Sequence, residues 1–168
     1  MIAVSPLSAP AKVFLIVHVV MAVIMVGAGY VYPILMAKMK ERGASRVPLT
    51  GVMKVIARGF TMPFLFIQPI TGLGLILTTR DRWNPFQPTN RWLFGSIVLF
   101  AVIFILDTFV AGPAIGRMHR LAEAGDFDTP AFEKDLGMLN RIGPVLGILF
   151  LTITVLMIWK PGGPDVHF

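Results

Sequence analysis

Four long hydrophobic stretches constrain this sequence more than any other feature in it. They cover approximately residues 12–36, 60–79, 92–112 and 142–159, roughly half of the 168-residue chain. Each offers about 20 mainly apolar residues, and an α-helix of that length, rising about 1.5 Å per residue, crosses the ~30 Å hydrocarbon core of a bilayer. Inside such a helix the backbone polar groups are satisfied without water. The sequence therefore predicts an all-α membrane protein, a four-transmembrane-helix bundle.

The composition excludes a water-soluble protein. The chain is 55% hydrophobic and only 14% charged, with a mean hydropathy of +0.76, values that a soluble domain with a polar surface does not have. The first hydrophobic stretch is too long for the apolar region of a signal peptide, so we expect a retained helix. No connection exceeds about 30 residues, which indicates a single domain over residues 1–168 with any site between helices or in loops. Because the chain has no cysteine, disulfides, thiolate metal sites and cysteine catalysis are excluded.

The basic residues are sorted by connection. Ten of the 15 lysines and arginines lie between the first and second or the third and fourth stretches, and five lie on the other side. The positive-inside rule then places those two connections in the cytoplasm and both termini on the periplasmic side of a bacterial inner membrane. Membrane topology accounts for the net charge of +6, so the charge does not indicate binding to nucleic acid. The expected partners are the lipid bilayer and other membrane subunits.

Several shorter signals refine this topology. Three tryptophans, Trp83, Trp92 and Trp159, fall at the predicted outer boundary, where aromatic side chains prefer to sit. Residues 47–60 mix valines and isoleucine with cations, which fits either a short amphipathic helix in the inner interface or an ordinary basic loop. Thr129 is expected to cap a helix that begins at Pro130.

Glycines and prolines predict how the helices pack and bend. The pairs Gly112/Gly116 and Gly143/Gly147 have the spacing that lets membrane helices approach closely. Pro63 and Pro69 should bend the second span, because proline leaves a backbone carbonyl without its helical donor.

Few strongly polar side chains interrupt the four stretches, and each should face the inside of the bundle because an exposed polar group is costly in lipid. At about 1.5 Å per residue, Tyr30, Gln68 and Asp107 lie at similar depth, some 9–12 Å from the cytoplasmic side. We therefore expect an intramembrane polar cluster of Tyr30, Gln68 and Asp107. Such a cluster could hold a proton, an ion or a cofactor substituent, or its members could simply hydrogen-bond one another between helices.

His18 lies nearer the outer side and has two interpretations. A neutral imidazole in a membrane helix can ligate haem iron, and apolar residues around it, such as Val17 and Met21, could flank a macrocycle. This makes His18 a possible ligand of haem b. The structural alternative is a histidine that hydrogen-bonds Thr71 or a backbone carbonyl.

The first stretch resembles a known family. Residues 18–30, followed by Pro33, look like the first helix of the HemJ/CopD-like superfamily of four-helix bacterial membrane proteins. Residues 69–75, Trp83 and residues 91–93 resemble it further along the chain. The resemblance is closest to the uncharacterised branch described as predicted integral membrane proteins.

The resemblance suggests activities that the residues match only in part. The HemJ branch implies protoporphyrinogen oxidase activity with a haem-contacting histidine in the first helix, which His18 matches, and a lysine in a later helix. Residues 91–97 contain no lysine, and the ten methionines do not gather in the outer site that a copper transporter would need. Neither activity is therefore carried over.

Three functions remain open from the sequence. The first is a non-catalytic accessory or assembly subunit of a larger bioenergetic membrane complex, because no catalytic triad, metal-spaced histidine cluster or phosphate-binding loop is present. The alternative is a haem- or porphyrin-binding oxidoreductase that uses His18. The third is a small proton- or ion-coupled transporter that uses Asp107.

Overall fold

A computed structural model describes residues 7–39, 45–79 and 84–161, and over these residues the chain is helical without strands. Four helices in this part are long and apolar enough to cross a membrane, which confirms the predicted all-α fold with four spans. The first and last are the single helices α1 (Ala9–Lys38) and α6 (Pro130–Trp159). The second joins α2 (Arg46–Ile56), η1 (Ala57–Thr61) and α3 (Met62–Thr78), and the third joins η2 (Pro88–Asn90), α4 (Arg91–Leu106), η3 (Asp107–Ala111) and α5 (Gly112–Glu123).

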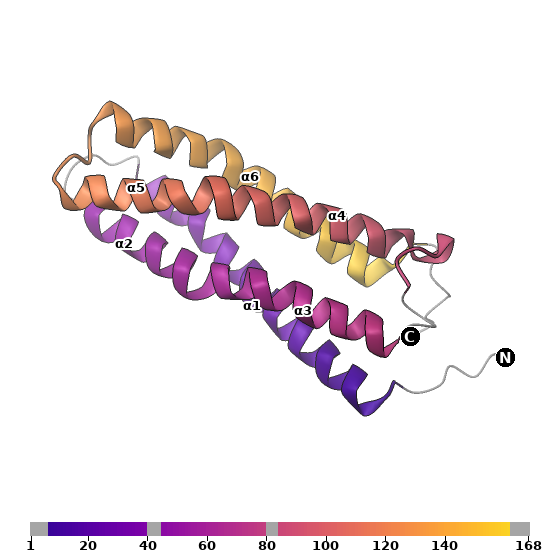
Figure 1. Cartoon of the computed structure of the whole chain (residues 1–168). Helices are drawn as coiled ribbons and strands as arrows, with labels where there is room; N and C mark the ends of the chain where they lie inside the picture. Colours follow the sequence, from indigo (N-terminus) through magenta and orange to yellow (C-terminus); the bar gives the residue numbers. More distant parts are fainter. Residues whose placement is uncertain (1–6, 40–44, 80–83, 162–168) are drawn as a thin grey trace.

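The four spans run antiparallel in chain order (Figure 1). The start of α1, the end of α3, the start of α4 and the end of α6 lie at one end of the molecule, which we call the terminal end. The end of α1, α2, α5 and the start of α6 lie at the other, which we call the basic end. The assignment of the basic end to the cytoplasm remains a prediction of the positive-inside rule.

The helices extend beyond the hydrophobic stretches at the basic end. The second and third spans contain 33 and 36 residues, and an α-helix of that length spans about 50 Å, more than the ~30 Å core of a bilayer. The segment 47–60, expected as an interfacial helix or a loop, instead forms α2 and η1 and continues directly into α3. The third span likewise continues past residue 112 as α5, and α6 begins 12 residues before the predicted start at 142.

Most of the core lies at the basic end, where α2 packs on α5 and α5 packs on α6. Its buried side chains come from these helices and from the end of α1: Met36, Met39, Met53, Ala57, Ala111, Ala114, Ile115, Met118, Ala122, Phe132, Leu136 and Leu139. A smaller cluster around Met25, Leu65 and Ile103 follows toward the terminal end, where α1 packs along α3 and α4 along α6.

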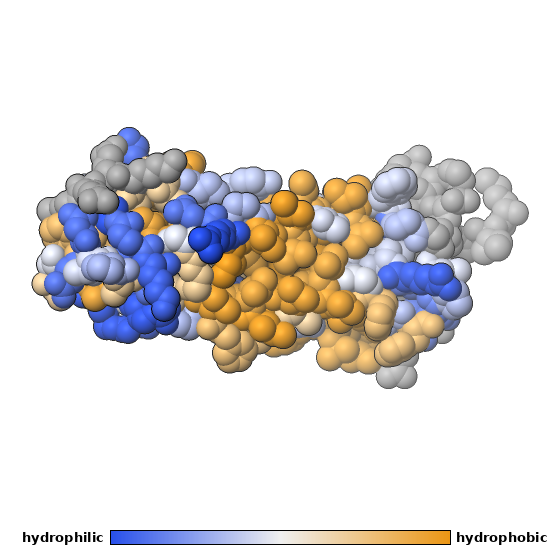
Figure 2. All heavy atoms as spheres, turned by 90° about the horizontal axis from the view of Figure 1, so that it is seen from above, coloured by the Kyte–Doolittle hydropathy of each residue, from blue (hydrophilic) through white to orange (hydrophobic). Residues whose placement is uncertain are grey.

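The middle of the molecule presents an apolar surface. Figure 2 shows a hydrophobic band between two ends that carry more hydrophilic residues. None of the most apolar 18-residue window of α6 is buried inside the chain. Because so many exposed apolar side chains would be unfavourable in water, this band is suited to face the interior of a membrane.

Two π-helical turns interrupt the second and third spans in the same way. The π turns cover residues 57–61 and 107–111. In each case one residue separates the end of the turn from a proline, Pro63 or Pro113. In both, the first N–H after the turn donates to the carbonyl five residues back. Proline lacks an N–H, and its ring collides with the carbonyl four residues earlier, so a wider turn relieves the crowding. A π turn thus precedes Pro63, one of the two prolines expected to bend the second span, and the equivalent turn before Pro113 was not predicted.

The predicted helix cap at Thr129 is present, and one of the two predicted close approaches at glycine occurs. Thr129 caps α6, because its hydroxyl accepts the N–H of Phe132 at 3.4 Å, as predicted. A Cβ added to Gly112 would lie 3.0 Å from the Met62 side chain, so the second and third spans do approach closely there. Gly143 and Gly147 have no atom within 4 Å of such a Cβ, and the close approach expected at this pair does not occur within the chain.

The tryptophans also differ from one another. Trp92 is buried at the start of α4, with 5% of its surface exposed, and the ammonium of Lys160 lies 5.9 Å from its ring. Trp159 is 77% exposed at the end of α6. Both belong to the terminal end, where the sequence places them at one boundary. Trp83 lies outside the described residues.

Candidate functional site

His18 joins α1 to α3 through both of its ring nitrogens. Its Nδ1 lies 3.0 Å from the hydroxyl of Thr71, and its Nε2 lies 3.1 Å from Nε2 of Gln68. The predicted structural alternative for His18, a hydrogen bond to Thr71, is therefore present. Gln68 is an additional partner that the sequence did not assign to His18.

The hydrogen bonds around His18 form a directional chain. The Thr71 hydroxyl donates to the backbone carbonyls of Ile67 and Gln68 at 3.1 and 3.0 Å, so it accepts the Nδ1–H of His18. The Gln68 amide then donates to Nε2. A neutral imidazole with its hydrogen on Nδ1 satisfies every bond in this chain, which suits a histidine among apolar helices.

The surroundings of His18 do not fit haem ligation. Iron binding requires a free ring nitrogen, and both nitrogens of His18 already have a partner. The ring also packs closely on α3, because a Cβ added to Gly72 would lie 3.3 Å from its Cε1. A macrocycle at His18 would have to break one hydrogen bond and separate α1 from α3.

The predicted cluster of Tyr30, Gln68 and Asp107 is not brought together. Gln68 is buried and turned toward His18, whereas Tyr30 is 63% exposed on α1. No hydrogen bond joins Tyr30, Gln68 and Asp107 in the described residues. The predicted cluster rested only on the similar depth of the three residues in the membrane. Depth does not determine which face of its helix a residue occupies, so it grouped residues that the fold does not bring together.

Asp107 instead lies close to the neighbouring tyrosine of α1. Tyr32 interacts with the side chain of Thr61 and is within electrostatic range of Asp107. Thr61 ends the first π turn and Asp107 begins the second, so the two residues that influence Tyr32 come from both interrupted spans. Asp107 has no ion pair or hydrogen bond from its carboxylate to any described residue.

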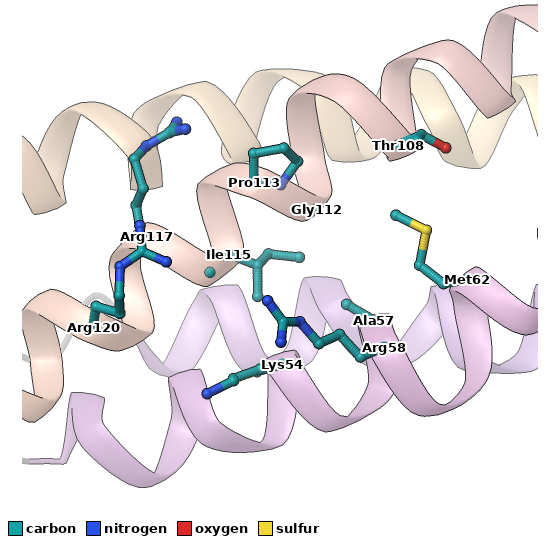
Figure 3. Close-up of a pocket in the computed structure, with 11 residues that line it drawn as sticks. Lys54, Ala57, Arg58, Met62, Thr108, Gly112, Pro113, Ile115, Arg117 and Arg120 are labelled. Atoms are coloured by element: carbon teal, nitrogen blue, oxygen red, sulfur yellow. The ribbon is translucent and has the colours of Figure 1, made fainter.

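A hollow lies at the basic end, between the second and third spans. A cavity of about 390 Å³ lies between α2 with η1 on one side and η3 with α5 on the other. Four cations line it, Lys54, Arg58, Arg117 and Arg120 (Figure 3). A second, neighbouring cavity of about 670 Å³ lies between α5 and α6 and also touches Arg117 and Arg120.

A buried arginine fixes the connections at this end. Arg46, at the start of α2, is 2% exposed. Its guanidinium donates to the carbonyls of Met39 and Phe127 at 2.9 and 2.7 Å, and to Glu133 at 2.6 Å. Its central carbon also lies 4.9 Å from the ring centre of Phe132. Sequence reasoning missed Arg46, although the acidic residues before and inside the start of α6 carried the complementary signal.

The described residues contain no group of three or more histidine, cysteine, aspartate or glutamate side chains that could hold a metal ion. They do contain four helices of membrane-spanning length, a histidine hydrogen-bonded within the chain and a cation-lined cavity at one end. These features define a multi-pass integral membrane protein.

A comparison with protein families identifies the family of the chain. It belongs to a family described as predicted integral membrane protein (DUF2269), whose model matches residues 12–161. Membership of an uncharacterised membrane-protein family was expected from the sequence, whereas the wider link to the HemJ/CopD-like superfamily is not shown. Comparisons with curated proteins and with solved structures gave no match.

Proposed function

We propose that this protein is a non-catalytic accessory or assembly subunit of a larger membrane complex. The observation that carries this proposal is an unpartnered face of α6. Gly143, Gly147 and Leu151 follow at four-residue spacing, all are exposed, and neither glycine has an atom within 4 Å of an added Cβ. Such a surface lets the backbone of another helix approach closely, which is the main source of helix association in lipid.

The arrangement of polar groups supports the same role. His18, Gln68 and Thr71 bond to one another inside the chain, so they serve the contact between α1 and α3 and leave an apolar exterior for other helices. A subunit that docks laterally in the bilayer needs this distribution.

The test compares two exposed glycines after extraction of the full chain from its native membrane in mild detergent. Gly147→Leu fills the α6 face, whereas Gly27→Leu fills an equally open position on α1. We expect wild type and Gly27→Leu to copurify with the same partner in fixed ratio, and Gly147→Leu to lose it. Equal retention by all three, or a complex that contains only copies of this chain, would contradict the proposal.

The location is part of this proposal. We place the protein in the inner membrane of a bacterium with both termini on the periplasmic side, because ten of 15 cations lie in the connections between the first and second and between the third and fourth predicted spans.

A second candidate, proton- or ion-coupled transport, is favoured by Asp107. An intramembrane carboxylate without an ion pair is costly and commonly marks an ion or proton path, and π turns recur at functional sites. Asp107 combines both features.

In proteoliposomes, we expect Asp107→Asn to abolish a transmembrane proton or cation flux that Asp107→Glu retains. Asp126→Asn, in the exposed connection before α6, is the matched control. Undiminished flux in Asp107→Asn would reject the transporter.

A further inference from the structure

The cavity at the basic end gathers positive charge on its walls. Lys54 and Arg58 extend from the second span toward α5, and Arg120 lies opposite them on α5 (Figure 3). The Arg120 guanidinium lies beside Gly116, because a Cβ added there would be in ordinary van der Waals contact with its Nη1, at 3.8 Å. Like charges around about 390 Å³ repel one another unless an anion lies among them.

Only one of the four cations is neutralised within the described residues. Arg117 points away from the cavity toward α6 (Figure 3), where Nε and Nη2 donate to the two carboxylate oxygens of Asp135 at 2.9 and 2.8 Å. Lys54, Arg58 and Arg120 form no ion pair or hydrogen bond with any described side chain. Three positive charges therefore remain available to a ligand.

The other end of the cavity is apolar. Met62 and Pro113 line it, on the side of Thr108 (Figure 3). The hydroxyl of Thr108, also in the lining, is buried and has no hydrogen-bond partner in the described part of the chain. From Arg120 to Thr108 the lining covers 12 residues, or about 18 Å of helix. The cavity thus passes from cationic to apolar along the direction of the helices.

We propose that this cavity binds an anionic phospholipid from the leaflet at the basic end, with its phosphate among Lys54, Arg58 and Arg120. Basic pockets between membrane helices at the level of the headgroups bind anionic lipids in this way, and guanidinium groups match phosphate geometry. The apolar end accepts the glycerol and the start of the acyl chains. A free phosphate would leave the apolar end of the cavity, at Met62 and Pro113, unoccupied.

The simpler explanation for these cations is the positive-inside rule alone. Arg141 allows the two explanations to be separated. Like Arg58 it is an exposed arginine close to the boundary of a predicted span, and it makes no ion pair or hydrogen bond with the described residues, but it does not line this cavity. A general surface field treats both arginines alike, whereas a lipid site depends on Arg58.

The experiment measures lipid retention by native mass spectrometry on the full-length protein in detergent, titrated with dioleoylphosphatidylglycerol or dioleoylphosphatidylcholine. We expect wild type to bind one phosphatidylglycerol in preference to phosphatidylcholine. Arg58→Gln should weaken that binding about fivefold, while Arg141→Gln stays within about twofold of wild type. Equal loss in Arg58→Gln and Arg141→Gln, or no preference for phosphatidylglycerol, would overturn the site.

A second variant and a soluble competitor complete the experiment. Arg120→Gln tests the opposite wall independently in case Arg58→Gln does not fold, and it should also weaken binding about fivefold. Glycerol 1-phosphate, a soluble headgroup, should not displace the bound lipid at millimolar concentration. If it binds as tightly as phosphatidylglycerol and depends on Arg58, the ligand is a soluble phosphate and the lipid proposal fails.

Discussion

The guanidinium nitrogen Nη1 of Arg46 lies 2.6 Å from the carboxylate oxygen Oε1 of Glu133, although 87 residues separate them in the chain. The same nitrogen lies 3.2 Å from Asp128. This contact ties the start of α2 to the start of α6, so the two halves of the chain are joined at the basic end by charge as well as by the apolar core.

Loss of the arginine should cost more than loss of the glutamate. Arg46→Gln removes the buried charge that bonds two backbone carbonyls and two carboxylates. We expect about 3 kcal/mol less stability, because all four groups lose their charged donor at once. Glu133→Gln should cost about 1 kcal/mol, since Glu133 is 40% exposed and Asp128 remains. Thermal unfolding in detergent measures both, with Arg141→Gln as a control. A smaller effect for Arg46→Gln than for Glu133→Gln would contradict this contact.

Gly74 should be required where α1 and α3 pack. A Cβ added to Gly74 would lie 2.5 to 2.8 Å from three ring atoms of Phe14, too close for the ring to remain in place. We expect Gly74→Ala to lower stability by about 1–3 kcal/mol. Gly95→Ala, at a helical position with no atom within 4 Å, should be neutral or slightly stabilising. The same unfolding assay compares the two, and Phe14→Leu should partly restore Gly74→Ala.

His18 should act with Gln68 as one unit. His18→Ala should destabilise the protein by about 2 kcal/mol, because it leaves the buried amide of Gln68 without its acceptor. Once Gln68→Leu has removed that amide, His18→Ala should cost about 1 kcal/mol less. A double-mutant cycle measures this coupling. Additive effects would show that the hydrogen bond does not contribute, and a visible absorption band that His18→Ala removes would instead indicate a bound pigment.

The sequence predicted the helices better than it predicted their contacts. Length and hydropathy are properties of each segment alone, so the four spans and the Thr129 cap were found directly. The partner of Gln68 depends on the rotation of α1 against α3, which depth along the membrane does not specify. Arg46 was missed because its partners Phe127, Asp128 and Glu133 follow it by more than 80 residues, and burial of an arginine is evident only after they meet.

The absence of cysteine from the sequence makes the predicted topology directly testable. Gln87→Cys places a single thiol at an exposed position just before η2, at the terminal end, and Asp126→Cys places one in the exposed connection between α5 and α6, at the basic end. If the positive-inside rule orients this chain, a membrane-impermeant maleimide should label Gln87→Cys in spheroplasts with intact inner membranes. Asp126→Cys should react only after detergent permeabilisation. Both thiols should react equally once the membrane is dissolved, which controls for local accessibility. The reverse order of labelling would place the basic end outside the cytoplasm and contradict the predicted orientation.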